Sequence, residues 1–392
     1  MLACGIDVSK GRHEVVLKSK ERKLQAFSLK NDREGFMKFL EKVPKDAIVG
    51  MEATNQYHKT LEWFLKNNGY PVYVFNPRKT HNFGAVNHFR MSTDKMDAEK
   101  LADFILMGFH ETQKQRKDKY PVIKQYCRLR MKLLKDKVKY QSRILNRLSV
   151  VFPEFESLFA VNFGVTYTEI LEKYTQPERF AELSVGVLGK ELASFSMGIL
   201  KEERAEKIIN AAKGSVEIRE NIDGYTEEIK TCIKYVKELD TDIERITKKI
   251  RSLMDDIPQN LTKIRGIDMP LAASIISEIG DISQFSGRKA LFNFTGMTPT
   301  VKQSGKFTGQ SRMSKNGSKH LRTAIWLAAI CCINHNKVFR DYFMKKTLVD
   351  KKRKIVAVGA VARKLSYHVY ASLKNGDGFD PEREIKSLAL SG

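Results

Sequence analysis

The sequence is poor in cysteine and has no long apolar segment. Its five cysteines are odd in number and form no Cys-x-x-Cys pair, so we expect neither a zinc site nor a disulfide framework but reduced thiols in a core. The longest apolar run, residues 324–333, is too short to span a bilayer and predicts a buried helix. The first ten residues lack the charged and apolar regions of a signal peptide.

Acidic residues are also scarce relative to basic ones. The chain has 46 Asp and Glu against 69 Lys and Arg, a net charge of +23, while 42% of its residues are hydrophobic. This composition predicts a globular protein that binds a polyanion, and nucleic acid is the leading candidate. A membrane-surface protein would need a basic amphipathic helix with an aromatic-rich apolar face. Neither terminus has one, so no membrane partner is expected.

The first 110 residues alternate between strand and helix patterns. Short apolar or alternating runs predict strands over residues 2–8, 14–19, 23–29, 47–51 and 71–75. Helices are expected after Asn31, after Glu52 and over roughly residues 94–107, where Thr93 is a helix cap. Three strands followed by alternating strands and helices predict a mixed α/β sheet.

The middle of the chain carries two heptad patterns, which predict long helices in a coiled coil. The first pattern comprises Cys127, Met131, Leu134, Val138, Gln141, Leu145, Leu148 and Phe152; the second comprises Ile218, Ile222, Tyr225, Ile229, Cys232, Val236, Leu239, Ile243, Ile246, Ile250 and Leu253. Antiparallel pairing with each other and pairing with a second subunit both stay open. Residues 114–147 are strongly basic, so their outer face is expected to contact phosphates, with a solvated surface as the alternative.

The C-terminal third is expected to be mainly helical. Residues 261–280 predict a helix, a glycine-containing hairpin and a second helix, and two interpretations stay open: a helix-hairpin-helix that offers backbone N–H groups to a phosphate, or an ordinary helical hairpin. Residues 302–364 contain 16 Lys and Arg against two acidic residues. Such concentrated charge predicts a nucleic-acid-binding surface.

Four carboxylates are placed to converge. Asp7 ends the first predicted strand and Glu52 the fourth, while Asp94 and Asp97 share a face at the start of a helix. Taken singly, each has an ordinary explanation as a turn, helix-start or surface residue. Their order on a basic chain favours a shared site. Close carboxylates repel unless a cation lies among them, and oxygen ligands select Mg²⁺ or Mn²⁺, the ions of phosphodiester chemistry.

Three segments with these acids resemble the acidic motifs of the DEDD transposases, which are insertion-sequence recombinases with a RuvC-like N-terminal domain, guided by a structured bridge RNA. The segments are GIDVSK at 5–10, MEATNQYH at 51–58 and MSTDKMDAEKLA at 91–102. Residues 264–285 and 292–329 resemble the family's C-terminal segments, including the pattern Ser-Gly…Lys-x-Gly-x-x-x-Leu-Arg. The resemblance covers nearly the whole chain in the expected order.

The resemblance implies an RNase H-like (RuvC-like) DEDD domain over residues 1–112, a helical coiled-coil region over 113–256 and a helical transposase domain over 257–392. It also implies Ser304 as the nucleophile that forms a covalent phosphoserine with DNA. Without the resemblance, Ser304 is a turn serine, and Ser311, Ser314 and Ser318 are equal candidates by spacing. Expected nucleic-acid contacts are Gly305, Lys306, Arg312, Lys315, Lys319 and Arg322.

The expected partners are DNA at element ends and target, a structured guide RNA, and further copies of the chain as a dimer that forms a tetramer on DNA. The guide RNA would bind the basic flanks of the N-terminal domain and the first coil. A prokaryotic cytoplasmic protein, nucleoid-associated when active, is implied. Three other functions stay open: a hydrolytic RNase H-fold nuclease such as a Holliday-junction resolvase, a site-specific DNA invertase of the same superfamily, and a non-catalytic nucleic-acid-binding protein.

Overall fold

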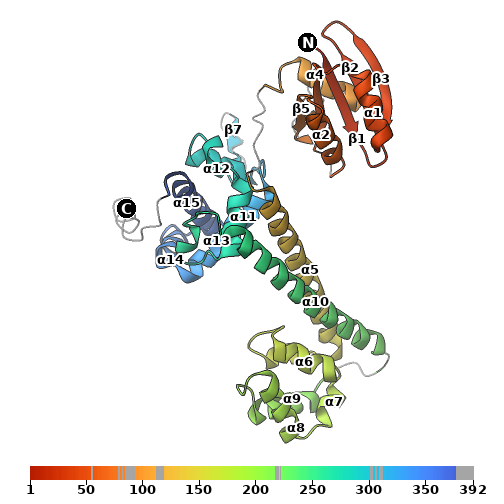
Figure 1. Cartoon of the computed structure of the whole chain (residues 1–392). Coiled ribbons are helices and arrows are strands. Elements are labelled where there is room, and N and C mark those ends of the chain that lie inside the picture. Colours follow the sequence, from red (N-terminus) through yellow and green to blue (C-terminus); the bar gives the residue numbers. More distant parts are fainter. Residues whose placement is uncertain are drawn as a thin grey trace. The chain divides into compact units, whose positions relative to one another are not determined.

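The chain folds into two compact units, Met1–Arg116 and Lys117–Gly392 (Figure 1). The computed structural model describes residues 1–53, 56–77, 80–81, 83, 93–111, 119–216, 220, 222–300 and 312–376, and the backbone of residues 303–304 and 307–308. Each unit has hydrophobic cores of its own.

The first unit is built on a five-stranded mixed sheet in the order β3-β2-β1-β4-β5. β1 pairs antiparallel with β2 and β2 with β3, whereas β1, β4 and β5 run parallel. This confirms the mixed α/β sheet predicted from the sequence. The strands are β1 (Ala3–Val8), β2 (Arg12–Lys18), β3 (Lys23–Lys30), β4 (Ile48–Glu52) and β5 (Val72–Phe75).

Helices cover both faces of this sheet. α1 (Arg33–Lys42) and α2 (His58–Asn67) bury Phe39 and Leu61 against one face, in the core that also contains Ile6 of β1. α4 (Asp94–Leu106) packs on the other face through a second core, to which it contributes Leu101 and Ile105. Because side chains alternate between the faces of a strand, β1 supplies both cores.

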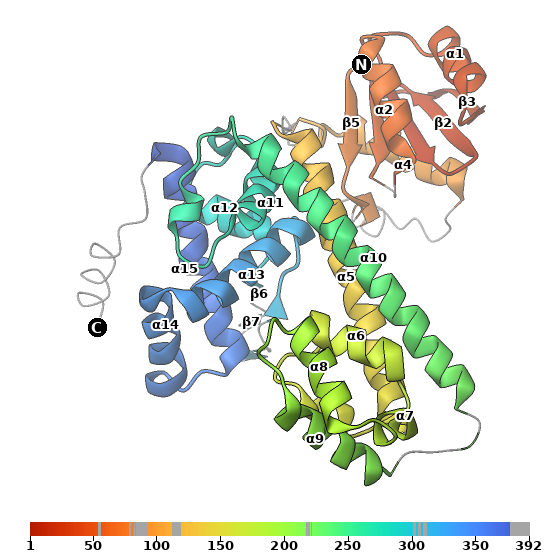
Figure 2. The same ribbon diagram turned by 60° about the horizontal axis from the view of Figure 1, so that its bottom comes forward.

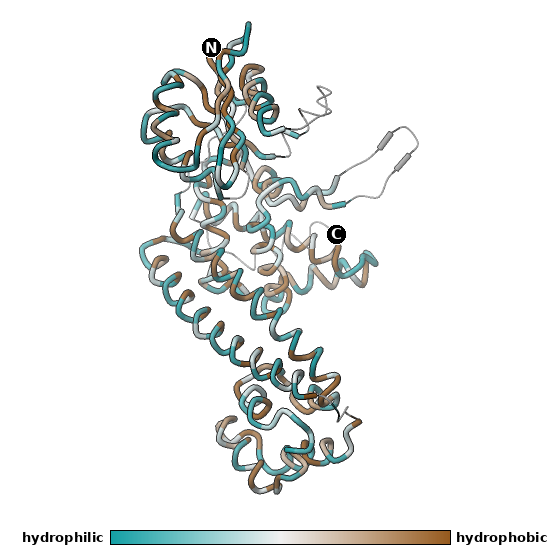
Figure 3. Tube along the Cα trace, turned by 90° about the vertical axis from the view of Figure 1, so that its right-hand side faces the viewer, coloured by the Kyte–Doolittle hydropathy of each residue, from teal (hydrophilic) through white to brown (hydrophobic). Residues whose placement is uncertain are grey.

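The second unit contains two long helices, α5 (Pro121–Val151) and α10 (Asp223–Met254), that lie side by side and antiparallel (Figure 2). Arg130 Nε donates to Thr247 Oγ1 at 2.8 Å, and Arg147 Nε lies 2.6 Å from Glu228 Oε2. Hydrophilic and hydrophobic residues alternate along both helices, as in other amphipathic helices (Figure 3). The structure therefore has the antiparallel pairing, and the supercoiling stays a prediction.

The predicted seam on α5 is wrong at Val138, in the middle of the helix, although Leu148 and Phe152 further along are buried as predicted. Val138 was expected in the seam but its side chain is 58% exposed. Towards its C-terminal end, α5 buries Ile144, Leu148 and Val151. These three belong to a core that α5 shares with the short helices after it as well as with α10. Packing against the short helices, which the heptad pattern alone does not reveal, determines which α5 residues are buried at this end.

A small helical bundle lies at one end of the helix pair (Figure 1). Its core is rich in aromatic rings, among them Phe155, Tyr167 and Phe180. It comprises η1 (Phe155–Leu158), α6 (Val165–Tyr174), α7 (Pro177–Ala181), α8 (Val185–Phe195) and α9 (Glu202–Lys213).

The C-terminal helices form another core at the opposite end of the pair (Figure 1). The predicted buried helix is confirmed as the central part of α13, where Ala328 and Ala329 are fully buried. All five cysteines are free, and four of them are buried. The elements are η2 (Leu261–Lys263), α11 (Met269–Ile279), η3 (Ile282–Gln284), α12 (Arg288–Thr295), β6 (Pro299–Thr300), β7 (Gln303–Ser304), β8 (Phe307–Thr308), β9 (Arg312–Met313), α13 (Lys319–His335), α14 (Lys337–Met344), η4 (Lys345–Val349) and α15 (Lys354–Asn375).

The helix-hairpin-helix expected over residues 261–280 is wrong in its first half. Only the short η2 precedes the turn, and α11 follows it. Gly266, with φ of +101°, packs against α13: a Cβ there would lie 2.8 Å from the carbonyl carbon of Cys331. Ile264 and Ile267 are buried on either side. The glycine allows a close backbone contact in the core, which explains its place in the sequence without a phosphate.

In the part of the chain that the structure describes, no helix is long and apolar enough to cross a membrane.

A buried ion pair joins the long helices to the C-terminal core. Glu278 on α11 has a side chain only 5% exposed and receives two bonds from Arg128 on α5, Nε to Oε1 at 2.6 Å and Nη2 to Oε2 at 3.0 Å. Ser318 Oγ also donates to Glu278 at 3.0 Å and caps α13 by accepting from the N–H of Leu321. One carboxylate thus ties together α5, α11 and the start of α13.

We expect Arg128→Ala to lower the free energy of unfolding by about 2–4 kcal/mol, because it leaves a buried carboxylate with one partner fewer. Lys139→Ala is the control, since its pair with Asp136 is exposed on the same helix and is expected to matter by less than about 0.5 kcal/mol. Urea unfolding of both variants measures the difference. Equal effects would show that the Glu278 contact does not anchor the fold.

Candidate active site

Asp7 and Glu52 end neighbouring parallel strands. Ile6 of β1 pairs with Met51 of β4, so Asp7 and Glu52 are the next residues along each strand. Ile6 and Met51 are buried in the core on the α1 and α2 side. Because side chains alternate between faces, Asp7 and Glu52 share the opposite face, which is the one that α4 covers.

Gly5 allows α4 to approach this face closely. A Cβ at Gly5 would lie 1.9 Å from the carbonyl oxygen of Ala98 on α4, so no larger residue fits there unless the helix moves. Gly50, which pairs with Gly5 across the strands, leaves room for Ile105 in the same way: a Cβ there would be 2.7 Å from Ile105 Cδ1. The backbone of α4 therefore rests directly on β1.

This contact brings the start of α4 towards Asp7. Thr93 caps the helix as predicted, with Oγ1 accepting from the N–H of Met96 at 3.3 Å. Asp94 and Asp97 lie in the first turn, and Asp97 immediately precedes the residue that touches Gly5.

Ion pairs hold the outer side of α4 in place. Lys18 Nζ on β2 lies 3.1 Å from Glu99 Oε1 and 2.8 Å from Asp103 Oδ1. Lys23 Nζ on β3 adds a contact of 2.9 Å with Glu99 Oε2. The helix is thus fixed by close backbone packing on one side and by paired charges on the other.

The four carboxylates influence one another electrostatically. The pKa of Asp7 is raised to about 6. Burial is the largest cause, the negative charges of Asp94, Asp97 and Glu52 add to it, and the N–H of Val8 acts in the opposite direction. Like charges that share a site disfavour ionisation in this way. All four predicted acids therefore act on one place, at the end of β1.

A divalent cation fits this donor set, because it would relieve the repulsion that raises the Asp7 pKa. Among the described residues, however, no three His, Cys, Asp or Glu side chains gather closely enough to form a ready-made metal site. Asp97 Oδ1 is 2.7 Å from Lys100 Nζ, and Glu52 accepts a hydrogen bond from Thr80 Oγ1. Ligation would require these carboxylates to exchange such partners for the ion.

Glu14 is a fifth carboxylate that the sequence patterns did not single out. It lies directly across from Asp7 in the antiparallel register of β1 and β2, and cross-strand partners point to the same face. Its Oε2 is buried and has no hydrogen-bond partner among the described residues, while Oε1 lies 3.6 Å from Arg12 Nε. Its one sequence signal is that it begins the strand predicted over residues 14–19, the next strand after that of Asp7.

Ser304 lies in a short hairpin of the second unit. β7 pairs antiparallel with β8, with Ser304 opposite Phe307, and β6 pairs with β9, with Thr300 opposite Arg312. Gly305 and Lys306, two of the predicted nucleic-acid contacts, lie outside the described residues, as does the side chain of Ser304.

Two glycines close the base of this hairpin region. Gly296 adopts φ of +69°, and its carbonyl accepts from the N–H of Lys315 at 2.9 Å. A Cβ at Gly317 would lie 2.1 Å from the carbonyl oxygen of Phe294. Arg322 Nη1 donates to the carbonyl of Thr295 at 2.9 Å. The Lys-x-Gly-x-x-x-Leu-Arg pattern therefore fixes the chain around the end of α12.

The other predicted nucleic-acid contacts lie near this base. Arg312, Lys315 and Lys319 are exposed, whereas Arg322 is half-buried and bonded to the backbone. The first three are free to meet a phosphate, and Arg322 is held in a structural contact.

Comparison with protein families gives matches at both ends of the chain. A DEDD transposase model named for IS110 matches residues 4–153, and a model of the transposases of the IS116/IS110/IS902 family matches residues 258–344. The first match includes all four predicted acids, and its DEDD domain implies an RNase H-like fold for the mixed sheet. A third model, described as a snoRNA binding domain of fibrillarin type, matches residues 129–290.

Curated relatives of low sequence identity are named as proteins of insertion elements or of gene inversion. The chain is 22% identical over 355 residues, 87% of each chain, to the insertion element IS116 uncharacterized 44.8 kDa protein of Streptomyces clavuligerus. It is 23% identical over 257 residues, 60% of this chain and 75% of the relative, to the pilin gene-inverting protein of Moraxella bovis. It is 28% identical over 134 residues, 34% of this chain and 36% of the relative, to the transposase for insertion sequence element IS1111A of Coxiella burnetii.

Asp7→Asn is expected to stabilise the metal-free protein at high pH. Because the folded-state pKa of Asp7 is about 6 and an unfolded Asp titrates near 3.9, folding takes up protons between about pH 4 and pH 6. The unfolding free energy of the wild type therefore falls as pH rises through this window. At about pH 8 the variant should be more stable by on the order of 1–2 kcal/mol, after discounting for solvent screening.

Calorimetry of the full chain in a chelator at about pH 4 and pH 8 measures this difference. The advantage of the variant should vanish at the lower pH, where Asp7 is protonated in the wild type. A constant advantage at both pH values would mean that Asp7 ionisation is not opposed by its neighbours.

Proposed function

The chain belongs to the IS110/IS116 family of transposases, and we propose that it exchanges DNA strands through an RNA-guided, Mg²⁺-dependent reaction with a covalent phosphoserine intermediate. The observation that carries the metal-dependent part is the convergence of three carboxylates on Asp7, whose pKa burial and these neighbouring charges together raise to about 6. Such a perturbed acid marks a functional site more often than a structural one.

Asp7, Glu52, Asp94 and Asp97 would hold Mg²⁺ or Mn²⁺. A bound divalent ion would polarise a DNA phosphate and offset the negative charge around it. Lys100, whose side chain is only 14% exposed and lies beside Asp97, would supply a positive charge next to one of the four carboxylates. Thr80 would orient Glu52 through its hydrogen bond.

Ser304 would supply the nucleophile. Its hydroxyl oxygen attacks the phosphorus, the bond from phosphorus to the 3′-oxygen breaks, and the departing 3′-oxygen gains a proton as the serine loses one. A 5′-phosphoserine results. The 3′-hydroxyl of a second strand then attacks the same phosphorus, and Ser304 recovers its proton. Each of the two steps breaks one phosphate ester bond and forms another, so the exchange needs no nucleotide cofactor.

The active site would be divided between two parts of the chain. The carboxylates lie in the first unit and Ser304 in the second, so the reaction requires the units to meet, within one subunit or between two. A dimer that forms a tetramer on DNA would allow either arrangement. We retain the division into residues 1–112, 113–256 and 257–392 as the functional one, with the protein in the cytoplasm and on the nucleoid.

A guide RNA would lie along the basic flanks of the first unit and along α5. This helix carries nine Lys and Arg and one acidic residue, which suits contact with phosphates. The similarity of residues 129–290 to a snoRNA binding domain supports RNA, since it spans most of α5 and all of α10.

A site-specific DNA invertase is the second candidate. The pilin gene-inverting relative supports it, because the same carboxylates and serine would serve inversion between fixed sites as well as transposition. A purely hydrolytic nuclease would use water and form no bond to the protein, so detection of a covalent protein–DNA adduct would distinguish the proposed function from it.

We expect Ser304→Ala to abolish a denaturation-resistant protein–DNA adduct formed with Mg²⁺, element-junction DNA and the RNA transcribed beside the gene. The adduct is lost because alanine has no oxygen to bond phosphorus. Ser314→Ala is the matched control, since Ser314 Oγ is bonded locally: it donates to the carbonyl of Gly296 and accepts from the N–H of Asn316. Denaturing gel electrophoresis of labelled DNA measures the adduct.

The same assay separates the parts of the proposal. An adduct that persists in Ser304→Ala rejects this nucleophile. Unchanged activity in both Asp7→Ala and Asp97→Ala rejects the metal site. Unchanged target choice when the RNA is omitted or digested rejects RNA guidance but leaves the recombinase intact.

A further inference from the structure

The two ends of the helix pair are packed into hydrophobic cores, whereas its middle is not. The C-terminal core includes Cys127 and Ile246, and the bundle core includes Ile144 and Val236. Between these positions, the described stretches of α5 and α10 contain no fully buried residue. The two helices are therefore held by cores at their ends, and the stretch between is free for another use.

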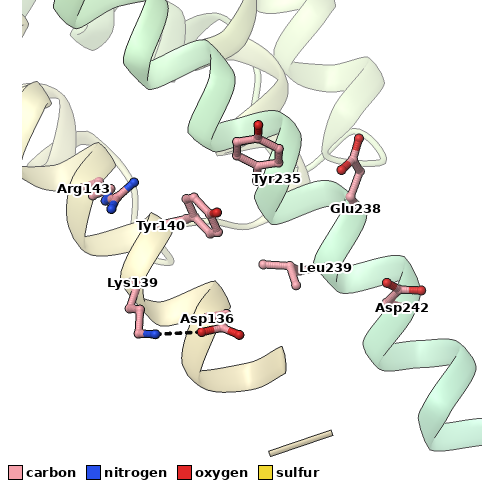
Figure 4. Close-up of a pocket in the computed structure, with 8 residues that line it drawn as sticks. All are labelled: Asp136, Lys139, Tyr140, Arg143, Tyr235, Glu238, Leu239 and Asp242. Carbon is pink, nitrogen blue, oxygen red and sulfur yellow. Dashed lines mark hydrogen bonds and ion pairs between the residues drawn. The ribbon is translucent and has the colours of Figure 1, made fainter. Parts of the chain in front are cut away.

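A cavity of about 400 Å³ occupies this stretch, a size typical of ligand pockets (Figure 4). α5 and α10 each contribute four lining residues: Asp136, Lys139, Tyr140 and Arg143 from the first, and Tyr235, Glu238, Leu239 and Asp242 from the second. Aromatic, aliphatic, cationic and anionic groups thus surround one space.

Two tyrosines form the aromatic wall of the cavity. The rings of Tyr140 and Tyr235 lie 5.0 Å apart between centroids with an interplanar angle of 39°, and the Arg143 guanidinium lies 5.6 Å from the Tyr140 ring. Tyr235 is 42% exposed, so a face of its ring is open to a flat ligand. Unpaired bases stack on such aromatic and guanidinium planes.

Several polar groups of the cavity are uncommitted. Within the described chain, neither tyrosine hydroxyl makes a hydrogen bond, and neither Arg143 nor Glu238 has an ion-pair partner. By contrast, Asp136 is paired with Lys139 and Asp242 with Arg245. The Glu238 carboxylate can accept from base amino groups and from a 2′-hydroxyl, and the Arg143 guanidinium can stack on a base.

We propose that this cavity binds an unpaired base of an RNA strand, with the base stacked on Tyr235 and Tyr140. The carboxylates around the cavity would repel a phosphate inside it, so the backbone runs outside, along the basic face of α5 where Lys132 and Lys135 lie. This inference rests on the proposed RNA partner and specifies how the RNA is held. The helix pair would bind an unpaired base by stacking, whatever its identity.

The test measures binding of the full-length protein to a labelled RNA hairpin with an unpaired loop, by fluorescence anisotropy. Tyr235→Leu should weaken binding about tenfold, the usual loss for one stacked base, and should leave the salt dependence unchanged because no phosphate contact is lost. Tyr235→Phe should bind as the wild type does. Binding to a fully paired RNA duplex should not change in either variant.

Tyr225→Leu is the matched control. Tyr225 lies on the same helix, is 38% exposed and has Arg147 5.1 Å from its ring, but it does not line the cavity. Equal loss in Tyr225→Leu and Tyr235→Leu, or no loss in either, overturns the cavity while the RNA partner stands. Equal loss on single-stranded DNA of the same sequence overturns the assignment to RNA. A wild-type protein that binds no RNA rejects both proposals.

Discussion

The close contact between β1 and α4 at Gly5 is the constraint on which the candidate site depends. A side chain there would collide with the backbone at Ala98, so the helix can lie low enough on the sheet to bring its first turn to Asp7. The arrangement has an electrostatic cost, since burial and three neighbouring acids raise the Asp7 pKa. Packing in the first unit thus offsets the cost of holding like charges together, which suits a site completed by a cation.

The second unit is organised around a different need, the firm support of a short hairpin. Glu278 joins α5, α11 and the start of α13, and Gly317 and Arg322 lock the chain around α12. Ser304 lies in the hairpin that these contacts support. Under the proposed function, firm packing beneath Ser304 and beneath the acids would let the two separate units form one reactive centre on DNA.

Much of this was predictable from the sequence. Short apolar or alternating runs indicated every strand of the sheet, and Thr93 indicated the start of α4. The seam on α5 was wrong at Val138, because that residue lies between the two cores that bury the ends of the helix pair. The role of Gly266 was missed because its close neighbour, Cys331, is far along the chain. Glu14 was missed for a different reason: it is near Asp7 in the sequence, but only the strand register places the two side by side on one face.

The central claim is that close packing at Gly5 creates the metal-binding half of the active site. Mn²⁺ affinity of the full chain, measured by electron paramagnetic resonance, tests it directly. Gly5→Ala changes no proposed ligand, yet it should weaken Mn²⁺ binding roughly tenfold or more by displacing α4. Gly11→Ala, where a Cβ meets nothing within 4 Å, should bind Mn²⁺ as the wild type does. Unchanged affinity in a folded Gly5→Ala protein would contradict the account.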